Sequence, residues 1–363
     1  MLFIGLATLI LFIFLQHITA ENNDVDPTKR IKTMEKDLYN GYGLSMEQDL
    51  STEIIYKKDG IVAYTDRIFR LFENKEDNVR RTARLMLELR KRLPKTITLS
   101  VMPIPPRSTI VEKYGNQERL YSDYLNLLGN ELTEDIHFID VSFTLKAHRE
   151  EYIYFRTEES WTALGAYYAV VEAAKVLGIE PISLESYDEH MYKKFIGSLL
   201  QETRILLKEG TDEHDKMTLI PDDRLYYHLL PNGKNQTEVW KKADGKLVSI
   251  KSPTITKSGP GTAAFVGGTT FERAVVEGDR KSDAKADASL LLIGDYNGKI
   301  LAPYFANYYE RVVVVNISEY KNFVLELDSI IQNYQVTDVV IAQKAENMGI
   351  SSVSRAINPL VTE

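Results

Sequence analysis

Short apolar runs alternate along this chain with longer stretches whose apolar positions recur at helical spacing. The runs predict strands at 96–102, 136–141, 289–294, 311–316 and 338–342, and the longer stretches predict helices at 74–93, 117–132, 162–177, 298–308 and 322–333. Continuous β-branched runs separated by helices are typical of a parallel sheet covered on both faces. The pattern therefore predicts an α/β fold with three layers (α/β/α) around a mainly parallel sheet.

The same pattern sets the limits of the predicted domain. A hairpin opens it at 53–64, where Asp59-Gly60 supplies the positive φ angles of a tight turn. We expect one domain over residues 51–347, with a partly irregular insertion at 202–261 that is rich in Pro, Gly, Asn and Lys. A polar connector at 21–50 precedes the domain, and a loose tail at 348–363 follows it.

Residues 1–20 carry a compartment signal. Residues 2–15 are almost wholly apolar, a run that is short for a membrane span of about 20 residues. The run fits the core of a signal peptide with Ile18-Thr19-Ala20 as the cleavage site, or an uncleaved anchor, although no Lys or Arg precedes it. A buried core helix is the remaining alternative. A signal peptide or an anchor places the rest of the chain outside the cytoplasm, secreted or held at the outer face of the cytoplasmic membrane.

The composition of the chain excludes several kinds of partner and site. The chain has 363 residues, of which 44% are hydrophobic and 26% charged, so it can bury a core without disulfides, and it contains 0 Cys. A net charge of -8 argues against nucleic acid as a main partner, because phosphate binding needs a basic face. The 6 His residues show no metal-ligand spacing. We therefore expect no metal site and no cofactor.

The most informative segment is residues 154–168, which read YFRTEESWTALGAYY. It resembles the signature of the bacterial DHHW proteins, in which an Arg-Thr-Asp-His-His-Trp-Thr run leads into a helix opening with Gly-Ala-Tyr. In this chain Glu158-Glu159-Ser160 stand in place of Asp-His-His. The resemblance continues in the same order over roughly 52–345, through the segments 58–60, 195–199, 264–269 and 293–296.

DHHW proteins are SGNH-hydrolase-like and resemble the alginate O-acetylation proteins. The resemblance therefore implies an SGNH-hydrolase-like domain that acts in O-acetylation of a cell-surface polysaccharide. It also implies two partners, the polysaccharide and a membrane-bound O-acyltransferase, with the N-terminus as the link to the membrane.

An SGNH-type enzyme needs a Ser nucleophile, a His base, a carboxylate that orients the His, and an oxyanion-hole donor. The resemblance aligns these positions with Tyr296, Ser160, Glu158 and Thr269. A phenol has a pKa of about 10 and is mostly protonated at neutral pH, and a Ser hydroxyl does not act as a base there. The resemblance therefore implies a member with a degenerate catalytic motif, and we expect no catalytic residue at these four positions.

Six residues of the two key segments are candidates for ligand binding: Arg156, Glu158, Glu159, Trp161, Asp295 and Tyr296. The two glutamates could form a carboxylate pair that binds a sugar hydroxyl or a cation. The alternative is that they lie at a helix N-terminus, where carboxylates face the positive end of the helix dipole and Thr157 is the N-cap.

The other candidates have structural alternatives as well. Trp161 could simply pack the following helix against the sheet, and Asp295 could cap the helix after Tyr296. Arg156 could pair with Glu158 or with Asp295, which would satisfy the charges of the site without catalysis.

Three functional hypotheses follow. The first is a catalytically degenerate protein that binds or scaffolds in polysaccharide O-acetylation. The alternative is an active O-acetyltransferase or esterase with displaced catalytic residues, for which Ser108 or Ser198 would have to reach His190. The third is a structural envelope protein without a ligand.

Overall fold

The computed structural model describes residues 51–349, apart from 245, 257–260, 269, 280–284, 286 and 318–322. All described residues belong to one compact unit, Glu47–Glu363. The predicted signal or anchor at 1–20, the connector at 21–50 and the tail beyond residue 349 lie outside the described residues. Within the described part, no helix combines the length and the apolar character that crossing a bilayer requires.

The domain is built on an 8-stranded sheet in the order β5-β4-β13-β11-β12-β10-β8-β9. The strands from β5 to β12 in this order pair in parallel, and β10, β8 and β9 add antiparallel pairs at one edge. Their bounds are β4 (Thr98–Ile104), β5 (His137–Phe138), β8 (Thr237–Ala243), β9 (Lys246–Ser252), β10 (Arg273–Glu277), β11 (Ser289–Gly294), β12 (Arg311–Asn316) and β13 (Val336–Lys344). The predicted fold class, three-layer α/β with a mainly parallel sheet, is confirmed.

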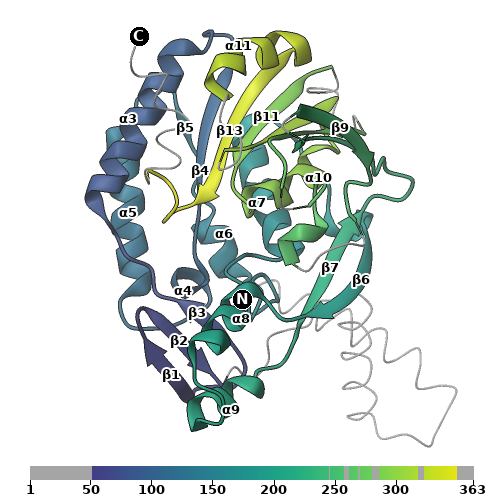
Figure 1. Cartoon of the computed structure of the whole chain (residues 1–363). Coiled ribbons are helices and arrows are strands. Elements are labelled where there is room, and N and C mark those ends of the chain that lie inside the picture. Colours follow the sequence, from purple (N-terminus) through teal and green to yellow (C-terminus); the bar gives the residue numbers. More distant parts are fainter. Residues whose placement is uncertain are drawn as a thin grey trace, which may run out of the picture. The chain divides into compact units, whose positions relative to one another are not determined.

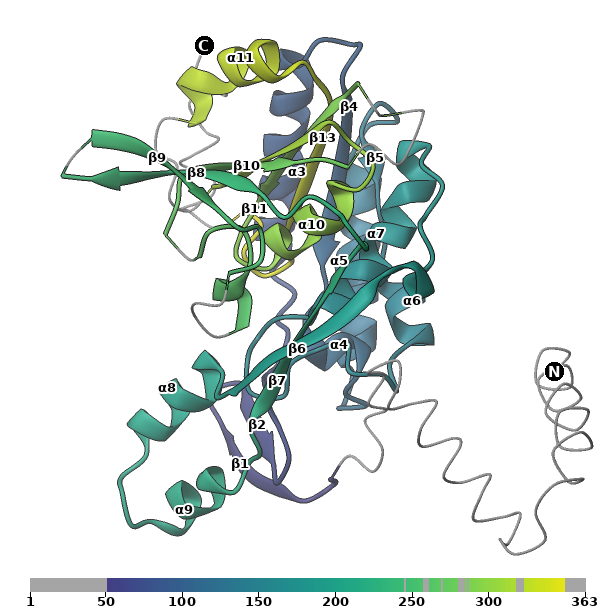
Figure 2. The same cartoon turned by 90° about the vertical axis from the view of Figure 1, so that its right-hand side faces the viewer.

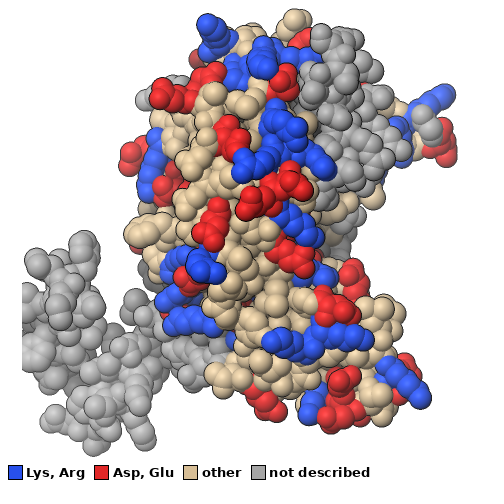
Figure 3. Space-filling view, turned by 90° about the vertical axis from the view of Figure 1, so that its left-hand side faces the viewer, with Lys and Arg blue, Asp and Glu red and all other residues tan. Residues whose placement is uncertain are grey.

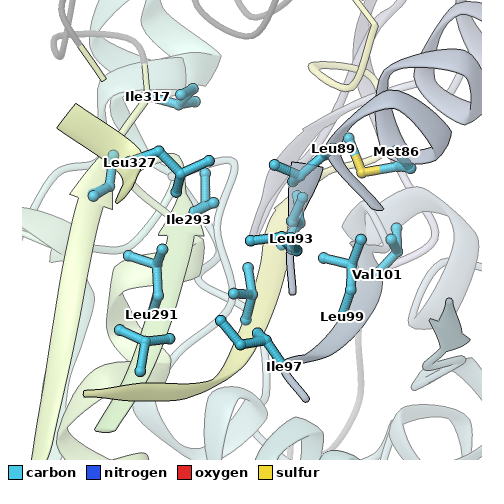
Figure 4. Packing of buried hydrophobic residues seen from close by; sticks show 14 of the residues in the cluster. Met86, Leu89, Leu93, Ile97, Leu99, Val101, Leu291, Ile293, Ile317 and Leu327 are labelled. Atoms are coloured by element: carbon cyan, nitrogen blue, oxygen red, sulfur yellow. The ribbon is translucent and has the colours of Figure 1, made fainter. Parts of the chain in front are cut away.

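Helices cover both faces of the sheet, as Figures 1 and 2 show. On one face α3 (Glu76–Arg92) and α11 (Phe323–Tyr334) pack against the sheet, and Leu89 and Leu327 belong to the same buried cluster as Leu291 and Ile293 of β11 (Figure 4). On the other face lie α7 (Ala163–Leu177), η3 (Gly298–Leu301) and α10 (Ala302–Phe305). All six residues of β11 are buried, as expected for a central parallel strand.

The sequence of helix α3 explains why this segment is helical and where the helix ends. Its buried residues follow one stripe, its first turn carries Glu76 and Asp77, and its last turn is basic, so the charges complement the helix dipole. The helix ends just before Pro94, which cannot continue it. Helix α5 (Gln117–Glu131) packs beside α3.

The exposed face of these two helices is solvated by mixed charges. Figure 3 shows Lys and Arg interspersed with Asp and Glu rather than gathered by sign. Several of them pair, for example Arg80 with Glu131 and Lys91 with Glu88. This face therefore lacks the single-sign field that nucleic acid would need.

A second, smaller sheet lies beside the carboxyl ends of the parallel strands. It contains β1 (Ile54–Lys58), β2 (Ile61–Tyr64) and β3 (Ile68–Arg70), and the predicted turn at Asp59 (φ 51°) and Gly60 (φ 75°) joins the first two strands. Helices α8 (Ser198–Leu206) and α9 (Asp212–Thr218) pack against it through apolar side chains. The predicted opening hairpin is thus confirmed and extended by one strand.

Much of the stretch predicted to be irregular, 202–261, has regular structure. It contains α9, the strand β7 (Asp223–Leu229), which pairs with β6 (Asp188–Phe195), and the strands β8 and β9 of the main sheet. Asn232, one of the residues that suggested irregularity, lies in a turn at φ 60°. Edge strands that are half-exposed and polar give only a weak apolar signal, which explains the error.

Two other elements are shorter than predicted. The strand expected at 136–141 is only β5, because the Asp140 carboxylate accepts a hydrogen bond from the backbone N–H of Ser142 at 2.8 Å and starts α6 (Ser142–Ala147). The helix expected at 298–308 divides into η3 and α10. The remaining short helices are α4 (Arg107–Ile110), η1 (Leu184–Ser186) and η2 (Gly261–Ala264).

Candidate functional site

The carboxyl ends of the parallel strands β4, β13, β11 and β12 meet at one edge of the sheet, because parallel neighbours run in the same direction. Binding and catalytic groups of open α/β sheets gather at this edge. Here it carries Ser108 after β4, Asp295 and Tyr296 after β11, and Lys344 at the end of β13.

Residues 154–161, the signature loop, form a tight bend that packs against this edge. Tyr154 and Trp161 form an isolated antiparallel bridge, and the N–H of Phe155 donates to the Ser160 carbonyl at 3.1 Å. The Trp161 side chain is 0% exposed, and its indole N–H donates to the backbone carbonyl of Asn297 at 3.0 Å. Trp161 therefore ties the signature loop to the turn after β11 rather than lining an open pocket.

Asp223 of β7, which sequence reasoning missed, holds the start of this loop. Its buried carboxylate accepts from the backbone N–H of Arg156 at 2.6 Å, the N–H of Thr157 at 2.7 Å, the Thr157 hydroxyl, and the Tyr152 hydroxyl at 2.5 Å. Burial raises the pKa of Asp223, and these donors oppose that rise. No local pattern could indicate it, because the carboxylate lies 66 residues from Thr157.

Glu158 lies at the N-terminus of α8. Its carboxylate accepts from the backbone N–H of Ser198 at 3.3 Å and from the Ser198 hydroxyl at 3.2 Å. The predicted helix N-terminus is therefore correct in kind but belongs to α8. In α7, Thr162 is the N-cap and accepts from the Gly165 N–H at 3.3 Å. Burial raises the pKa of Glu158, and the hydrogen bonds to Ser198 oppose that rise.

The predicted N-cap, Thr157, also acts on α8 rather than α7. Its hydroxyl accepts from the backbone N–H of Gly197 at 2.7 Å. A Cβ on Gly197 would lie 2.4 Å from the Thr157 carbonyl, so only glycine permits this close approach. The signature loop and α8 are thus locked together.

Ser160, at the position that the resemblance gives to the catalytic His, is 3% exposed. Among the residues that the structure describes, its hydroxyl has no hydrogen-bond partner.

The alternative with displaced residues requires contacts that the structure lacks. The Ser108 hydroxyl is fully buried and has no hydrogen-bond partner among the described residues, and the Ser198 hydroxyl donates to Glu158. His190 is exposed on β6 and stacks on Tyr227 at 5.1 Å. Neither serine is therefore paired with His190, because the histidine lies on the exposed face of a hairpin.

Asp295 closes the turn after β11. Its carboxylate accepts from the backbone N–H groups of Asn297 (2.9 Å), Gly298 (3.2 Å) and Lys344 (3.0 Å) and from the Asn347 side chain (2.9 Å). The carboxylate caps η3 and at the same time fastens the end of β11 to the end of β13. This is the capping alternative that the sequence offered for Asp295.

Tyr296 and Lys299 lie next in this turn. Lys299 is 1% exposed, and its Nζ donates to the Gly268 carbonyl at 2.5 Å. The same Nζ lies 5.9 Å from the ring centroid of Tyr296, which is half-buried, and 5.7 Å from that of Phe271. Burial lowers the pKa of Lys299 to about 7. The predicted oxyanion position, Thr269, follows Gly268 and lies outside the described residues.

Glu159 turns away from Glu158 and pairs with two cations. Its carboxylate lies 2.8 Å from the Arg70 Nε and 3.5 Å from the Lys344 Nζ. Burial would lower the pKa of Lys344, but the carboxylates of Glu346, Glu159 and Asp295 raise it overall. The two adjacent glutamates therefore do not act as a carboxylate pair, because each has its own partners.

A cavity of about 280 Å³ lies beside the Glu159–Arg70 pair, where β13 ends. Charged side chains of both signs line it, namely Arg70, Lys75, Asp59, Glu73 and Glu346. The Oε2 atom of Glu346 is buried and has no hydrogen-bond partner within residues 51–349 as far as the structure describes them, and burial raises the pKa of this carboxyl. A ligand with hydroxyl or amine donors could satisfy it.

In the described part of the chain, no group of three or more His, Cys, Asp or Glu side chains is arranged to hold a metal ion.

Comparison with known proteins identifies the family. The model of the DHHW protein family matches residues 136–315, which include the signature loop and the β11 turn. The chain belongs to the DHHW family. The model described as an SGNH hydrolase-like domain, acetyltransferase AlgX, matches residues 64–202. No curated protein sequence gives a significant match.

Solved structures show that the DHHW chain shares its fold with distant relatives. A DHHW family protein from Eubacterium siraeum superposes with a TM-score of 0.67 at 20% identity, covering 85% of this chain and 98% of the other. Bacillus cereus PatB1, solved with a sulfonyl adduct, superposes with a TM-score of 0.63 at 13% identity, over 83% and 98% of the chains. At these identities the likeness concerns the fold.

Proposed function

We propose that this DHHW protein acts outside the cytoplasm in the O-acetylation of a cell-surface polysaccharide, as a binding or scaffolding component. The match to an SGNH hydrolase-like acetyltransferase domain supports the acetylation context. The observation that supports the non-catalytic role is Ser160, at the position of the catalytic His, whose buried hydroxyl has no hydrogen-bond partner within the described part of the chain.

The other positions support the same proposal. A phenol at Tyr296 replaces the nucleophile, and Glu158 holds the N-terminus of α8 instead of orienting a base. Removing one member of such a triad costs orders of magnitude in rate. Loss of both nucleophile and base leaves no route for Ser–His–Asp hydrolysis.

The cavity beside Glu159 supports the binding role. Its volume suits one sugar ring, and carboxylate, guanidinium and ammonium groups can hydrogen-bond to sugar hydroxyls. The unpartnered Glu346 oxygen offers a buried acceptor for one of them. We propose this cavity as the polysaccharide-binding site, with a membrane-bound O-acyltransferase as the protein partner and residues 1–20 as the link to the membrane.

Ester hydrolysis by the purified protein tests the absence of triad catalysis. We expect no sustained turnover of acetyl esters by the wild-type protein, and slow turnover by the Tyr296→Ser, Ser160→His double variant, because that variant restores nucleophile and base. Sustained turnover by the wild-type protein would overturn the proposed role.

Titration with cell-surface polysaccharide fragments tests the binding role. Arg70→Met should weaken binding about tenfold, in keeping with one lost charge-assisted hydrogen bond. Arg80→Met is the matched control, because Arg80 is similarly exposed on α3 and also pairs with a glutamate. Equal affinities for the two variants would exclude this cavity as the binding site.

A further inference from the structure

The two cations that line the cavity at the end of β13 are already engaged by carboxylates. The Arg70 Nε lies 2.8 Å from a carboxylate oxygen of Glu159, and the Lys75 Nζ lies 2.8 Å from a carboxylate oxygen of Glu73. A negatively charged ligand group would therefore have to compete with these glutamates for each cation. The positive charge of the lining is already neutralised.

Two further carboxylates of the lining are left without a cation among the lining residues that the structure describes. Asp59 is exposed in the turn between β1 and β2, and Glu346 follows β13 with its Oε2 atom buried. Burial raises the pKa of Glu346, and the charge of Lys344 only partly opposes that rise. The Lys344 Nζ itself is paired with Glu159 at 3.5 Å. A positive group in the cavity would stabilise the ionised form of both carboxylates.

Aromatic rings form another part of the lining. Phe72 and Tyr124 are both buried, and their rings meet edge to face with centroids 5.7 Å apart. The Tyr124 hydroxyl donates to the sulfur of Met348 at 3.5 Å, so it does not compete for Glu346. Aromatic rings attract cations through their negative faces. Carboxylates beside aromatic rings make a suitable environment for a cationic ligand group.

We propose that this cavity selects a sugar unit with a free amine, so that the polysaccharide bound here contains hexosamine units without an N-acetyl group. The inference rests on the proposed function, which gives the cavity to a polysaccharide, and it adds the class of polysaccharide. The protonated amine donates to the buried Oε2 atom of Glu346, and Asp59 contributes a second negative charge to the same cavity.

The same charges disfavour the other common classes of sugar. An N-acetyl group is neutral and adds a carbonyl acceptor, which gains nothing from a carboxylate. A uronic acid would place a third unpaired carboxylate beside Asp59 and Glu346, and like charges in one site repel. A neutral hexose can hydrogen-bond to Glu346 but forms no ion pair, and hydrogen bonds between two ionised groups are the stronger ones.

Calorimetric titration of the full-length protein in detergent tests this selectivity. Three probes of equal length are compared at about pH 6, where amines are protonated: a glucosamine oligosaccharide, the same oligosaccharide with its amines N-acetylated, and a galacturonate oligosaccharide. We expect the glucosamine probe to bind about tenfold more tightly than the N-acetylated one, in keeping with one charge-assisted hydrogen bond. The galacturonate probe should bind most weakly.

Three variants connect the preference to the cavity. Glu346→Gln keeps the shape of the side chain and removes its charge, so the preference for the free amine should fall about tenfold. Asp59→Asn should lower it in the same direction, and the turn tolerates the change because Asn also adopts a positive φ. Glu88→Gln is the matched control, because it changes the net charge equally but lies in an exposed pair with Lys91 on α3. It should leave the preference unchanged.

The inference would be overturned by no binding of the glucosamine probe, by equal or tighter binding of either other probe, or by a preference that survives in both Glu346→Gln and Asp59→Asn. Equal affinities that Arg70→Met still weakens would refute the selectivity and keep the cavity as the polysaccharide site. Affinities that neither Arg70→Met nor Glu346→Gln changes would refute the site itself, and with it the binding role proposed above.

Discussion

Replacing Lys299 with methionine tests whether the turn after β11 encloses a neutral amine. Burial lowers the pKa of Lys299 from 10.5 to about 7 in the folded chain. Between these values the unfolded chain holds a proton that the folded chain has released. The free energy of unfolding therefore rises with pH across this window. Methionine has a similar shape and no proton to lose, so in the Lys299→Met variant residue 299 contributes no pH dependence to the free energy of unfolding.

The magnitude follows from the pKa difference. For one titrating group, the free energy of unfolding changes by about 1.4 kcal/mol for each pH unit between the two pKa values. From about pH 7.5 to about pH 9.5 the wild type should therefore gain about 3 kcal/mol relative to Lys299→Met. Below about pH 7 the lysine is protonated in both folded and unfolded chains, so the advantage of the variant is constant and at its largest there.

Urea unfolding at several pH values, followed by tryptophan fluorescence, measures this difference. Subtracting the variant from the wild type removes the contributions of all other titrating groups. Lys193→Met serves as the control, because Lys193 is not enclosed and its removal should leave the slope unchanged. A difference between wild type and Lys299→Met that does not change with pH would mean that the folded chain keeps a charged ammonium at this position, and the reasoning would be refuted.

Three further predictions concern the signature loop. Trp161→Phe removes the indole hydrogen bond to the β11 turn and should lower the free energy of unfolding by about 1–2 kcal/mol, measured by urea denaturation. Asp223→Asn turns an N–H group toward backbone donors and should cost about 3 kcal/mol, with faster hydrogen exchange at 154–161; unchanged exchange would contradict the role of Asp223. Gly197→Ala should cost about 2 kcal/mol, because its Cβ would lie 2.4 Å from the Thr157 carbonyl, whereas Gly129→Ala, with its nearest contact at 3.8 Å, should not destabilise.

The sequence predicts the centre of this fold well and its edge poorly. β11, β12 and β13 are continuous apolar runs, because both faces of each strand are buried, and such runs stand out from any neighbouring pattern. β8 and β9 are half-exposed and alternate irregularly, so their pairing at the edge of the sheet has no comparable signal.

The candidate site is also only partly predictable from the sequence. The resemblance locates the signature loop and the β11 turn, but the partners of their residues come from distant segments. Glu158 and Glu159 are neighbours in sequence, yet one binds the N-terminus of α8 and the other Arg70 and Lys344. The sequence does not predict the burial of the Lys299 side chain, because a buried lysine is indistinguishable in sequence from one on a helix surface. Only the packing around η3 reveals its enclosure.

The position of β13 in the sheet has a consequence for how the chain folds. This strand comes from residues 336–344, yet it pairs with β4, from residues 98–104, on one side and with β11 on the other. During synthesis β4 is complete long before its partner exists, so the sheet cannot close until almost the whole chain has emerged. Contacts of such high sequence separation slow folding and leave β4 exposed meanwhile. A chain that stops short of residue 336 would have two unjoined half-sheets, each with an open edge.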